Sequence, residues 1–392
     1  MLKNSTILVS AIYLSFSLDS LLKIGSTFKI HIGVLSALIF VFIVALAKPG
    51  FAAKGLLKNF TFSVFVFYCI LNGVASQAPG FRDILPYILI STAILIYCHV
   101  TYSKVNTRAF YYFQAALILS GLIQYYLFFA HGYQVSFIDA EHYQKTSSVS
   151  SRLRGFFIEP NWFAIALAFN TLLLVKDRPI EFLKKHKAMS ALTGLVIVLN
   201  GSIAPIALLC ITYAVPFIKK SPVKGAIFSV LLLGILLAVF SYREQLSEQN
   251  NATTTLNHLS RWTPLMRVIG YQAETDLTTI VFGNGLGSWG TLAIQNRLSV
   301  LVYETAPESR DGSEIPVFIF ELGLIGIFLI LLDSFYMYQR CPKGQHYLKA
   351  GVLFFLAFLF LYPTLKFWMY MPYYFYLRAA IHAQRKPSRI TH

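Results

Sequence analysis

One apolar run of the chain extends from Glu314 to Met337 and reads EIPVFIFELGLIGIFLILLDSFYM. Its charged residues are Glu314, Glu321 and Asp333. The run is long enough to cross a hydrocarbon core of about 30 Å as a helix. Polar and apolar residues do not alternate along it, as they would in a strand of a membrane barrel. The run therefore predicts a transmembrane helix.

Similar runs recur along all 392 residues, and runs of about 17–22 residues predict about twelve spans. The composition is 56% hydrophobic and 13% charged, whereas soluble domains are about 25% charged. This excludes a soluble globular domain and a disordered chain. We expect an all-α integral membrane protein in which 1–392 form a single polytopic membrane domain. The predicted spans are 5–22, 31–48, 60–77, 84–102, 109–130, 161–176, 188–200, 203–219, 225–241, 314–337, 348–363 and 364–381.

The basic residues predict which side of the membrane each loop faces. Of the 33 Lys and Arg residues, 21 (Arg378 among them) are assigned to the side that holds both termini. The positive-inside rule assigns that side to the cytoplasm. The net charge of +16 is therefore largely explained by topology and does not indicate nucleic acid. Two loops, 131–160 and the large loop 242–313, then face outward, and the large loop is compatible with helix around 261–276.

The outward basic residues differ in kind from the inward ones. The inner side holds 15 Lys and 6 Arg, and the outer side holds 4 Lys and 8 Arg. Seven of the eight outer arginines lie in the two outward loops. Topology does not require arginine, whereas bidentate binding of a carboxylate or phosphate does. Two interpretations stay open, namely salt bridges within the loops and an anion site at the outer membrane surface.

The first outward loop ends in a motif that carries Arg152, Arg154, Gly155 and Glu159. Pro160 follows and suits the first turn of a helix, so Glu159 would lie at a helix N-terminus, where a negative charge is favourable. Glu159 is then either a capping anion or a carboxylate that orients or deprotonates a hydroxyl. Gly155 either permits a close backbone approach or is an ordinary loop glycine.

The large loop carries Arg261 and Arg267, followed by Gly283, Gly285 and Gly287. The two arginines are six residues apart, so on a helix they would not share one narrow face. No strand precedes the glycines and no βαβ unit surrounds them, which excludes a dinucleotide-binding loop. We interpret the glycine segment as a flexible turn that brings backbone close to a ligand or to the membrane surface.

The run that starts at Glu314 contains the third motif. Glu314 lies at the outer mouth, where it could act as a base, and Glu321 lies about two helical turns further in. A carboxylate at that depth needs a cavity or a partner. The structural alternative for Glu321 is an interhelical hydrogen bond beside a close-packing pair, Gly323 and Gly326. The other polar residues within spans are scattered and form no chain like a proton relay: Asp19, Asn170, Asn200, Asp333 and Lys366.

These three motifs, in this order, resemble the superfamily of bacterial Wzy-type O-antigen polymerases and O-antigen ligases. The family pattern is Arg-x-x-Gly before Glu-Pro, then an arginine and a Gly-x-Gly segment in a large outer loop, then Glu-x-Gly-x-x-Gly. The resemblance covers roughly residues 150–330. Ligases carry a His near the end of the large loop, whereas this chain reads Arg310-Asp311-Gly312-Ser313-Glu314 there, which favours a polymerase. The matching residues are Arg152, Gly155, Glu159, Pro160, Asn161, Arg261, Gly283 to Gly287, Glu321, Gly323 and Gly326.

The resemblance implies a GT-C-type glycosyltransferase fold in the bacterial inner membrane, with the active site facing the periplasm. The implied reaction is an inverting, metal-independent glycosyl transfer without a cofactor. Its donor and acceptor are glycans linked to undecaprenyl pyrophosphate, and membrane lipid, a chain-length regulator and a flippase are the implied partners. Arginines would stabilise the pyrophosphate leaving group, and a carboxylate would deprotonate the acceptor hydroxyl. The implied site consists of Arg152, Arg154 and Arg261 on the pyrophosphate, Arg267 in support, Glu314 or Glu159 as the base, and Gly155 and Glu321 as supporting residues.

Three alternatives stay open. An O-antigen ligase would transfer the glycan to lipid A-core. A transporter or flippase of lipid-linked oligosaccharides would show a repeat between its two halves, and none is visible in this sequence. A membrane scaffold without chemistry would leave the outward excess of arginine unexplained.

Overall fold

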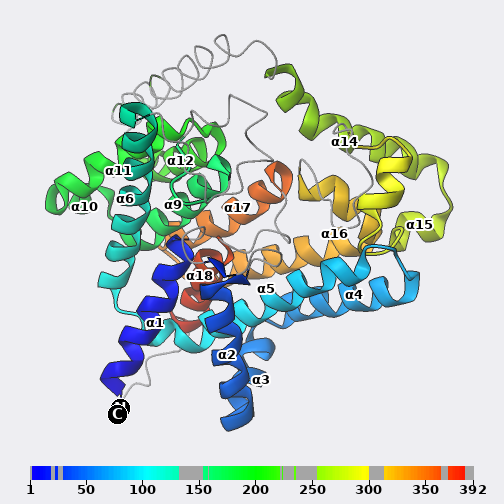
Figure 1. Ribbon diagram of the computed structural model, residues 1–392, viewed down its shortest axis with the longest axis horizontal. Coiled ribbons are helices and arrows are strands. Elements are labelled where there is room, and N and C mark those ends of the chain that lie inside the picture. The colour runs from blue at the N-terminus through cyan, green and yellow to red at the C-terminus, as the bar shows by residue number, and fades with distance from the viewer. Residues whose placement is uncertain are drawn as a thin grey trace.

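The computed structural model describes residues 2–18, 23–24, 30–131, 153–157, 159–220, 223, 234, 254–299, 313–362 and 370–384. Within these ranges the chain is helical almost throughout (Figure 1). The exception is one pair of two-residue antiparallel strands, β1 (Lys23–Ile24) and β2 (Ile30–His31). The predicted all-helical class is therefore confirmed.

Each predicted span contains a helix except 225–241, which lies outside the described residues apart from Gly234. Two helical segments, Phe81–Lys104 and Glu314–Arg340, are long and apolar enough to cross a membrane singly. A pair of helices bent by 114°, Ile32–Ala47 and Pro49–Lys58, brings the number to as many as three among the described residues. The helices are α1 (Leu2–Ser17), α2 (Ile32–Ala47), α3 (Pro49–Lys58), α4 (Phe60–Ser76), α5 (Phe81–Thr101), η2 (Tyr102–Lys104), α6 (Thr107–His131), α9 (Pro160–Val175), α10 (Pro179–Lys185), α11 (Lys187–Asn200), α12 (Ile203–Lys220), α14 (Thr254–Glu274), α15 (Leu277–Phe282), the π-helical η3 (Trp289–Ala293), α16 (Glu314–Arg340), α17 (His346–Leu361) and α18 (Met371–Gln384).

Helix α18 is the centre of the main core. Every residue from Met371 to Ile381 is buried, and the helix packs against α5, α9, α16 and α17 (Figure 1). A helix that is buried on all sides must be surrounded by other elements. Aromatic rings fill much of the contact, and the Tyr374 ring stacks on Phe355 with centroids 4.1 Å apart.

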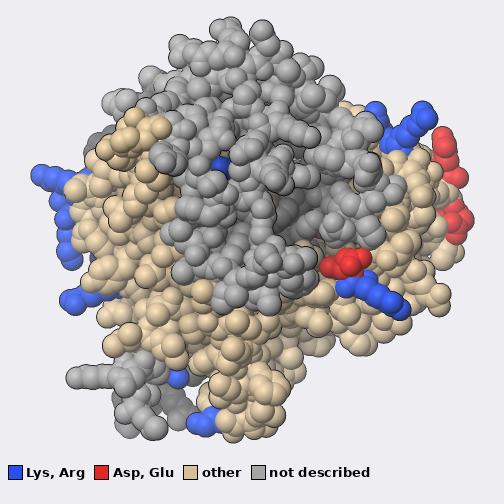
Figure 2. Space-filling view, in the orientation of Figure 1, with Lys and Arg blue, Asp and Glu red and all other residues tan. Residues whose placement is uncertain are grey.

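Of the helices around α18, α5, α16 and α17 have buried residues and exposed apolar residues, whereas α9 has no exposed residue. On α16, Leu324, Phe328 and Phe335 are exposed, whereas Ile330 and Met337 are buried. Figure 2 shows a broad area of described surface without charged side chains, and groups of charged side chains near the edges of the view. Large exposed apolar faces are unusual on proteins in water and suit contact with lipid.

The helix α16 is broken at Gly323, which has φ 60° and ψ −162°. The expected continuous helix over 314–337 is therefore wrong at this point. The break separates a first half (314–322) from a second half (324–340). A Cβ at Gly323 would lie 2.5 Å from the carbonyl oxygen of Val281, so glycine allows the backbone of 281–283 to pass close by.

The large predicted loop 242–313 contains α14, α15 and η3, which we call the loop module. Helix α14 includes most of the stretch expected to be helical. The loop module packs on the first half of α16 around a small separate core, and it lies far from α1 in Figure 1. The first half of α16 therefore belongs to two packing units, the small core and the main core. The residues of the small core are Val268, Trp289, Ala293, Leu298, Val317 and Phe320.

Candidate functional site

The segment 153–157, which carries part of the first motif, is held by the side chain of Gln124 on α6. The backbone N–H groups of Arg154 and Gly155 both donate to Gln124 Oε1, at 2.7 and 2.9 Å. Gly155 has φ +56°, and a Cβ there would lie 2.5 Å from Ser120 Oγ. Of the two interpretations of Gly155, the structure therefore supports the close backbone approach.

A second anchor of this segment is Asn200, the last residue of α11. Its Nδ2 donates to the carbonyl oxygens of Leu153 and Pro160, at 2.5 and 2.8 Å. Its Oδ1 accepts from the N–H of Ser202 at 3.1 Å. The sequence analysis counted Asn200 among scattered polar residues. The one local signal was the following glycine, because Asn-Gly marks a turn.

The structure places the charged residues of the first motif as follows. Arg154 is buried, with 6% of its surface exposed. Glu159 occupies the N-cap of α9 with extended backbone, and Pro160 is the first helical residue, as predicted. The Glu159 side chain makes no capping hydrogen bond, so the capping interpretation holds for its position only. Arg152 lies outside the described residues.

The break in α16 is capped by other segments of the chain. The last four carbonyl groups of a helix have no intrahelical partner, and in the first half of α16 these belong to residues 319–322. Donors come from α14, from the loop after α15 and from α4. The bonds run from Gln272 Nε2 to Ile319 O (3.3 Å), from Asn284 N to Phe320 O (2.8 Å), from Gly285 N to Glu321 O (2.9 Å) and from Tyr68 Oη to Leu322 O (2.8 Å).

The loop after α15, residues 282–287, contains the three glycines and is here called the glycine loop. Gly283, Gly285 and Gly287 have φ +81°, +98° and +90°. A Cβ at Gly283 would overlap the carbonyl group of Glu321, and one at Gly285 would overlap the side chain of Ser76. The glycine loop is therefore closely packed between α16 and the α4–α5 turn. The expectation of a flexible turn beside a ligand or the membrane surface is not supported, because protein backbone fills that place.

Two side chains of α4 that the sequence did not single out, Asn72 and Tyr68, also bind the glycine loop. Asn72 Nδ2 donates to Phe282 O, and Asn72 Oδ1 accepts from Leu286 N, each at 2.7 Å. Tyr68, one helical turn earlier on the same face, donates to Phe282 O at 3.2 Å as well as to Leu322 O. Both residues lie in an ordinary apolar run, and nothing in their spacing pointed to the loop.

Glu321 takes part in the same assembly, and 1% of its surface is exposed. Its Oε1 accepts from the backbone N–H of Trp289 at 3.0 Å. This partner is the first residue of η3 in the loop module, so the bond joins two helices, as the structural alternative expected. Gly323 forms the helix break instead of a packing surface. The supporting role of Glu321 in the site stays a prediction.

Glu314 begins α16 and is completely buried, with 0% exposed. It is buried because the first half of α16 packs into both cores, and its expected place at the outer mouth stays a prediction. A carboxylate in the first turn is favoured by the helix dipole.

The assigned arginines lie on different segments. Arg154 belongs to the segment bound by α6 and α11, whereas Arg261 and Arg267 are both on α14. Arg267 Nη1 donates to the carbonyl oxygens of Arg297 and Ser299, at 2.8 and 2.9 Å. It therefore braces the chain that follows η3. The side chain of Arg261 lies outside the described part.

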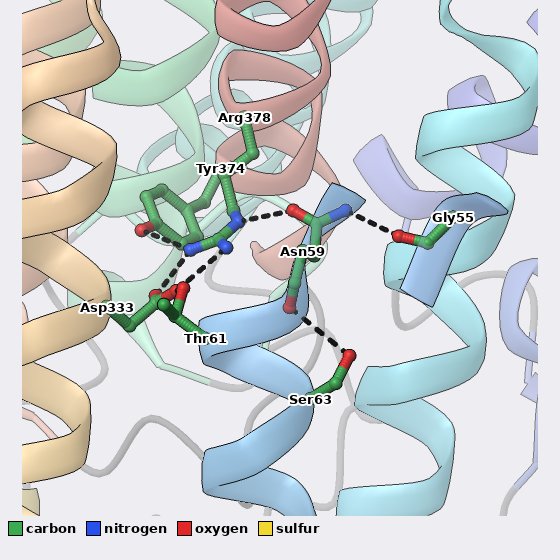
Figure 3. Close-up of polar contacts among 7 residues, drawn as sticks. All are labelled: Gly55, Asn59, Thr61, Ser63, Asp333, Tyr374 and Arg378. Atoms are coloured by element: carbon green, nitrogen blue, oxygen red, sulfur yellow. Dashed lines mark hydrogen bonds and ion pairs between the residues drawn. The ribbon is translucent and has the colours of Figure 1, made fainter. Parts of the chain in front are cut away.

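A second polar cluster joins α4, α16 and α18 (Figure 3). Arg378 binds Asp333 in a bidentate ion pair, with Nη1 to Oδ2 at 2.5 Å and Nη2 to Oδ1 at 2.9 Å. Arg378 Nε also donates to Asn59 Oδ1 at 3.0 Å, and Thr61 Oγ1 donates to Asp333 Oδ1 at 2.5 Å. Both charged residues are buried, with 1% and 0% of their side chains exposed.

This ion pair joins two residues that the sequence did not connect. Arg378 was assigned to the cytoplasmic side, and Asp333 was one of the scattered polar residues. In the fold each is the other's partner across 45 residues of sequence. Arginine suits this place because its planar fork matches a carboxylate.

In the described part of the chain, no group of three or more His, Cys, Asp or Glu residues could hold a metal ion. Comparison with protein-family models and with curated proteins finds no match to this chain.

Proposed function

We propose that this protein is a polysaccharide polymerase of the bacterial inner membrane. It joins oligosaccharide repeat units, linked to undecaprenyl pyrophosphate, into O-antigen or a related surface polysaccharide. In this proposal about twelve helices cross the membrane, both termini are cytoplasmic, and the loops 131–160 and 242–313 face the periplasm. A chain-length regulator and a flippase would be its partners.

The observation that carries the proposal is the burial of Arg154 and Glu314. Both belong to segments expected on the outer side, and 6% and 0% of their surfaces are exposed. Ionisable groups are costly to bury in an apolar protein and mark functional sites within membranes. A buried cation and a buried carboxylate, each at the start of a helix or just before one, are what the proposed transfer needs.

The chemistry requires one bond to form and one to break. The acceptor sugar hydroxyl attacks the anomeric carbon of the donor glycan from the face opposite the pyrophosphate, which inverts the configuration. The bond between that carbon and the pyrophosphate oxygen breaks, and the hydroxyl proton passes to a carboxylate. We assign this base to Glu314, with Glu159 as the alternative. Arg152, Arg154 and Arg261 would stabilise the leaving pyrophosphate, and Arg267 would support them through the loop module.

The surface glycan of cells that lack the protein tests the proposal. A polymerase is supported if lipid A-core carries a single repeat unit. Uncapped core together with accumulating lipid-linked polymer would indicate a ligase. Loss of outward glycan, with intact precursor at the inner face, would indicate a flippase.

At the residue level, Glu314→Gln should reduce the polymerisation rate by about 10²–10⁴-fold, the usual contribution of a general base. Gln keeps the shape of the side chain but cannot take up the proton. The rate is measured on purified full-length protein in nanodiscs with a lipid-linked repeat unit. Glu274→Gln, at an exposed position on α14, is the control and should retain full activity.

Glu159→Gln completes this series. If Glu159→Gln is inactive while Glu314→Gln is active, the base is Glu159. If both variants retain the wild-type rate, carboxylate-catalysed polymerisation is wrong. Arg152→Ala and Arg154→Ala should abolish chain extension while the protein still reaches the membrane.

A further inference from the structure

The contacts between α4 and the break in α16 extend the proposed function, and this inference rests on it. We propose that Asn72 and Tyr68 are positioning residues of the polymerisation site. Through the glycine loop and the break, they set the place of the Glu314 carboxylate. They touch neither substrate nor Glu314 in this proposal and act through the first half of α16.

A tilt of the first half of α16 at the break would displace Glu314, which lies at the other end of this half. From residue 323 to residue 314 this half spans about 13 Å, at 1.5 Å per residue. A tilt of about 5° at the break would therefore move Glu314 by about 1 Å. A misplacement of that size in an active site can reduce the rate by about 100-fold.

Three segments donate hydrogen bonds to the carbonyl groups at the break, and of these three α4 belongs to the main core. Gln272 and the glycine loop come from the loop module or its margin, whereas Tyr68 donates from α4 directly to Leu322 O. Asn72 binds both ends of the glycine loop, as donor to Phe282 and as acceptor from Leu286. Hydrogen bonds from α4 thus orient the backbone at the break.

Helix α4 is well suited to this because its own start is fixed. Its residue Thr61 binds Asp333 on the second half of α16, and the preceding Asn59 binds Arg378 on α18. The second half of α16 is therefore held to the start of α4, and the break to its later turns. Helix α4 thus donates hydrogen bonds to both halves of α16.

The two side chains should differ in effect. Tyr68→Phe removes one hydroxyl and leaves Leu322 O without that donor, so we expect kcat to fall about tenfold. Asn72→Ala removes both bonds to the glycine loop, and we expect a fall of about 100-fold. In both variants KM for the acceptor should stay within about twofold, because the lost contacts do not bind substrate.

The experiment uses purified full-length protein in nanodiscs with an undecaprenyl-pyrophosphate-linked repeat unit, and it measures kcat, KM and the unfolding temperature. The controls are Tyr112→Phe on exposed α6 surface and Asn296→Ala, whose amide binds only Leu292 O among described contacts. Both controls should retain the wild-type kcat. If Asn72→Ala does not fold, the test relies on Tyr68→Phe, which removes only one oxygen atom from a half-buried side chain.

A combination with Glu314→Gln separates positioning from general loss of structure. If Asn72 and Tyr68 act through Glu314, adding either variant to Glu314→Gln should lower kcat by less than about twofold. A full multiplicative loss, or wild-type kcat in both single variants, would overturn the inference and leave the proposed function intact. A wild-type protein that makes no polymer overturns the proposed function, and this inference with it.

Discussion

Two polar regions hold α4 in the helix bundle, and they use different chemistry. At the start of α4, Asn59 and Thr61 bind the buried ion pair of Arg378 and Asp333 through side chains. Further along, Tyr68 and Asn72 bind mainly backbone groups, at the break in α16 and in the glycine loop. In the first region α4 binds charged side chains, and in the second it binds backbone groups.

The two regions should therefore affect two different properties, the stability of the fold and the position of Glu314. A buried ion pair leaves an uncompensated charge if one partner is lost, so its disruption is felt by the whole fold. The region around the break depends on shape, because glycines permit backbones to approach where a Cβ would overlap them. We therefore expect changes in the first region to act on folding and changes in the second to act on the placement of Glu314.

The largest expected effect is that of Arg378→Ala. It leaves the buried carboxylate of Asp333 without its bidentate partner, and we expect a loss of about 3–5 kcal/mol in the free energy of unfolding. The amount of monodisperse protein after extraction and the thermal unfolding of that protein measure this loss.

The matched control replaces both partners, with Arg378→Met and Asp333→Leu in one chain. Replacing a buried ion pair by apolar residues is often neutral or stabilising, so the double variant should recover most of the lost stability. Equal instability of the single and double variants would show that the charges are not the reason for the effect.

The next effect is that of Gly323→Ala. An L-residue at φ 60° and ψ −162° is strained by about 1–3 kcal/mol, and the added Cβ would lie 2.5 Å from Val281 O. We expect the protein to accumulate in the membrane but to lose polymerisation, because the first half of α16 must shift. Membrane protein level and glycan ladders measure the two outcomes together.

Gly270→Ala on α14 is the control, since a Cβ there would meet nothing within 4 Å. In a helix this change is neutral or stabilises by about 0.5–1 kcal/mol. Wild-type ladders from Gly323→Ala would show that the break does not need its present backbone conformation.

The smallest effect is that of Thr61→Val, which removes one hydroxyl from the Asp333 carboxylate. Two bonds from Arg378 stay in place. We therefore expect the free energy of unfolding to fall by about 1.5 kcal/mol, the lower end of the range for a hydrogen bond to a charged group. Polymerisation should be unchanged. Thr92→Val, which loses only a bond to its own helix at Ile88 O, is the control in thermal unfolding and should change stability less.

Much of the fold could be predicted, because apolar length is a local property. Each predicted span within the described residues contains a helix, and Glu159 and Pro160 begin α9 as expected. The break at Gly323 could not be predicted. Its glycine pattern also suits close helix packing, and the difference depends on a loop that lies about forty residues earlier in the chain.

The candidate site was predictable in its residue types but not in its surroundings. Motif and charge pointed to Arg154, Glu314 and Glu321, whereas their burial became visible only once the helices were packed. Asn72, Asn200 and Arg378 were missed, because an amide or a guanidinium in an apolar run does not show which segment it will meet.

Hydrophobic length and composition were thus enough to predict a helical, apolar chain. These signals are carried by neighbouring residues and need no partner. Packing settled the pairing of Arg378 with Asp333, the capping of residues 319–322 and the burial of Glu314. Each of these depends on groups distant in sequence, whose hydrogen bonds become favourable only when the surrounding helices exclude water.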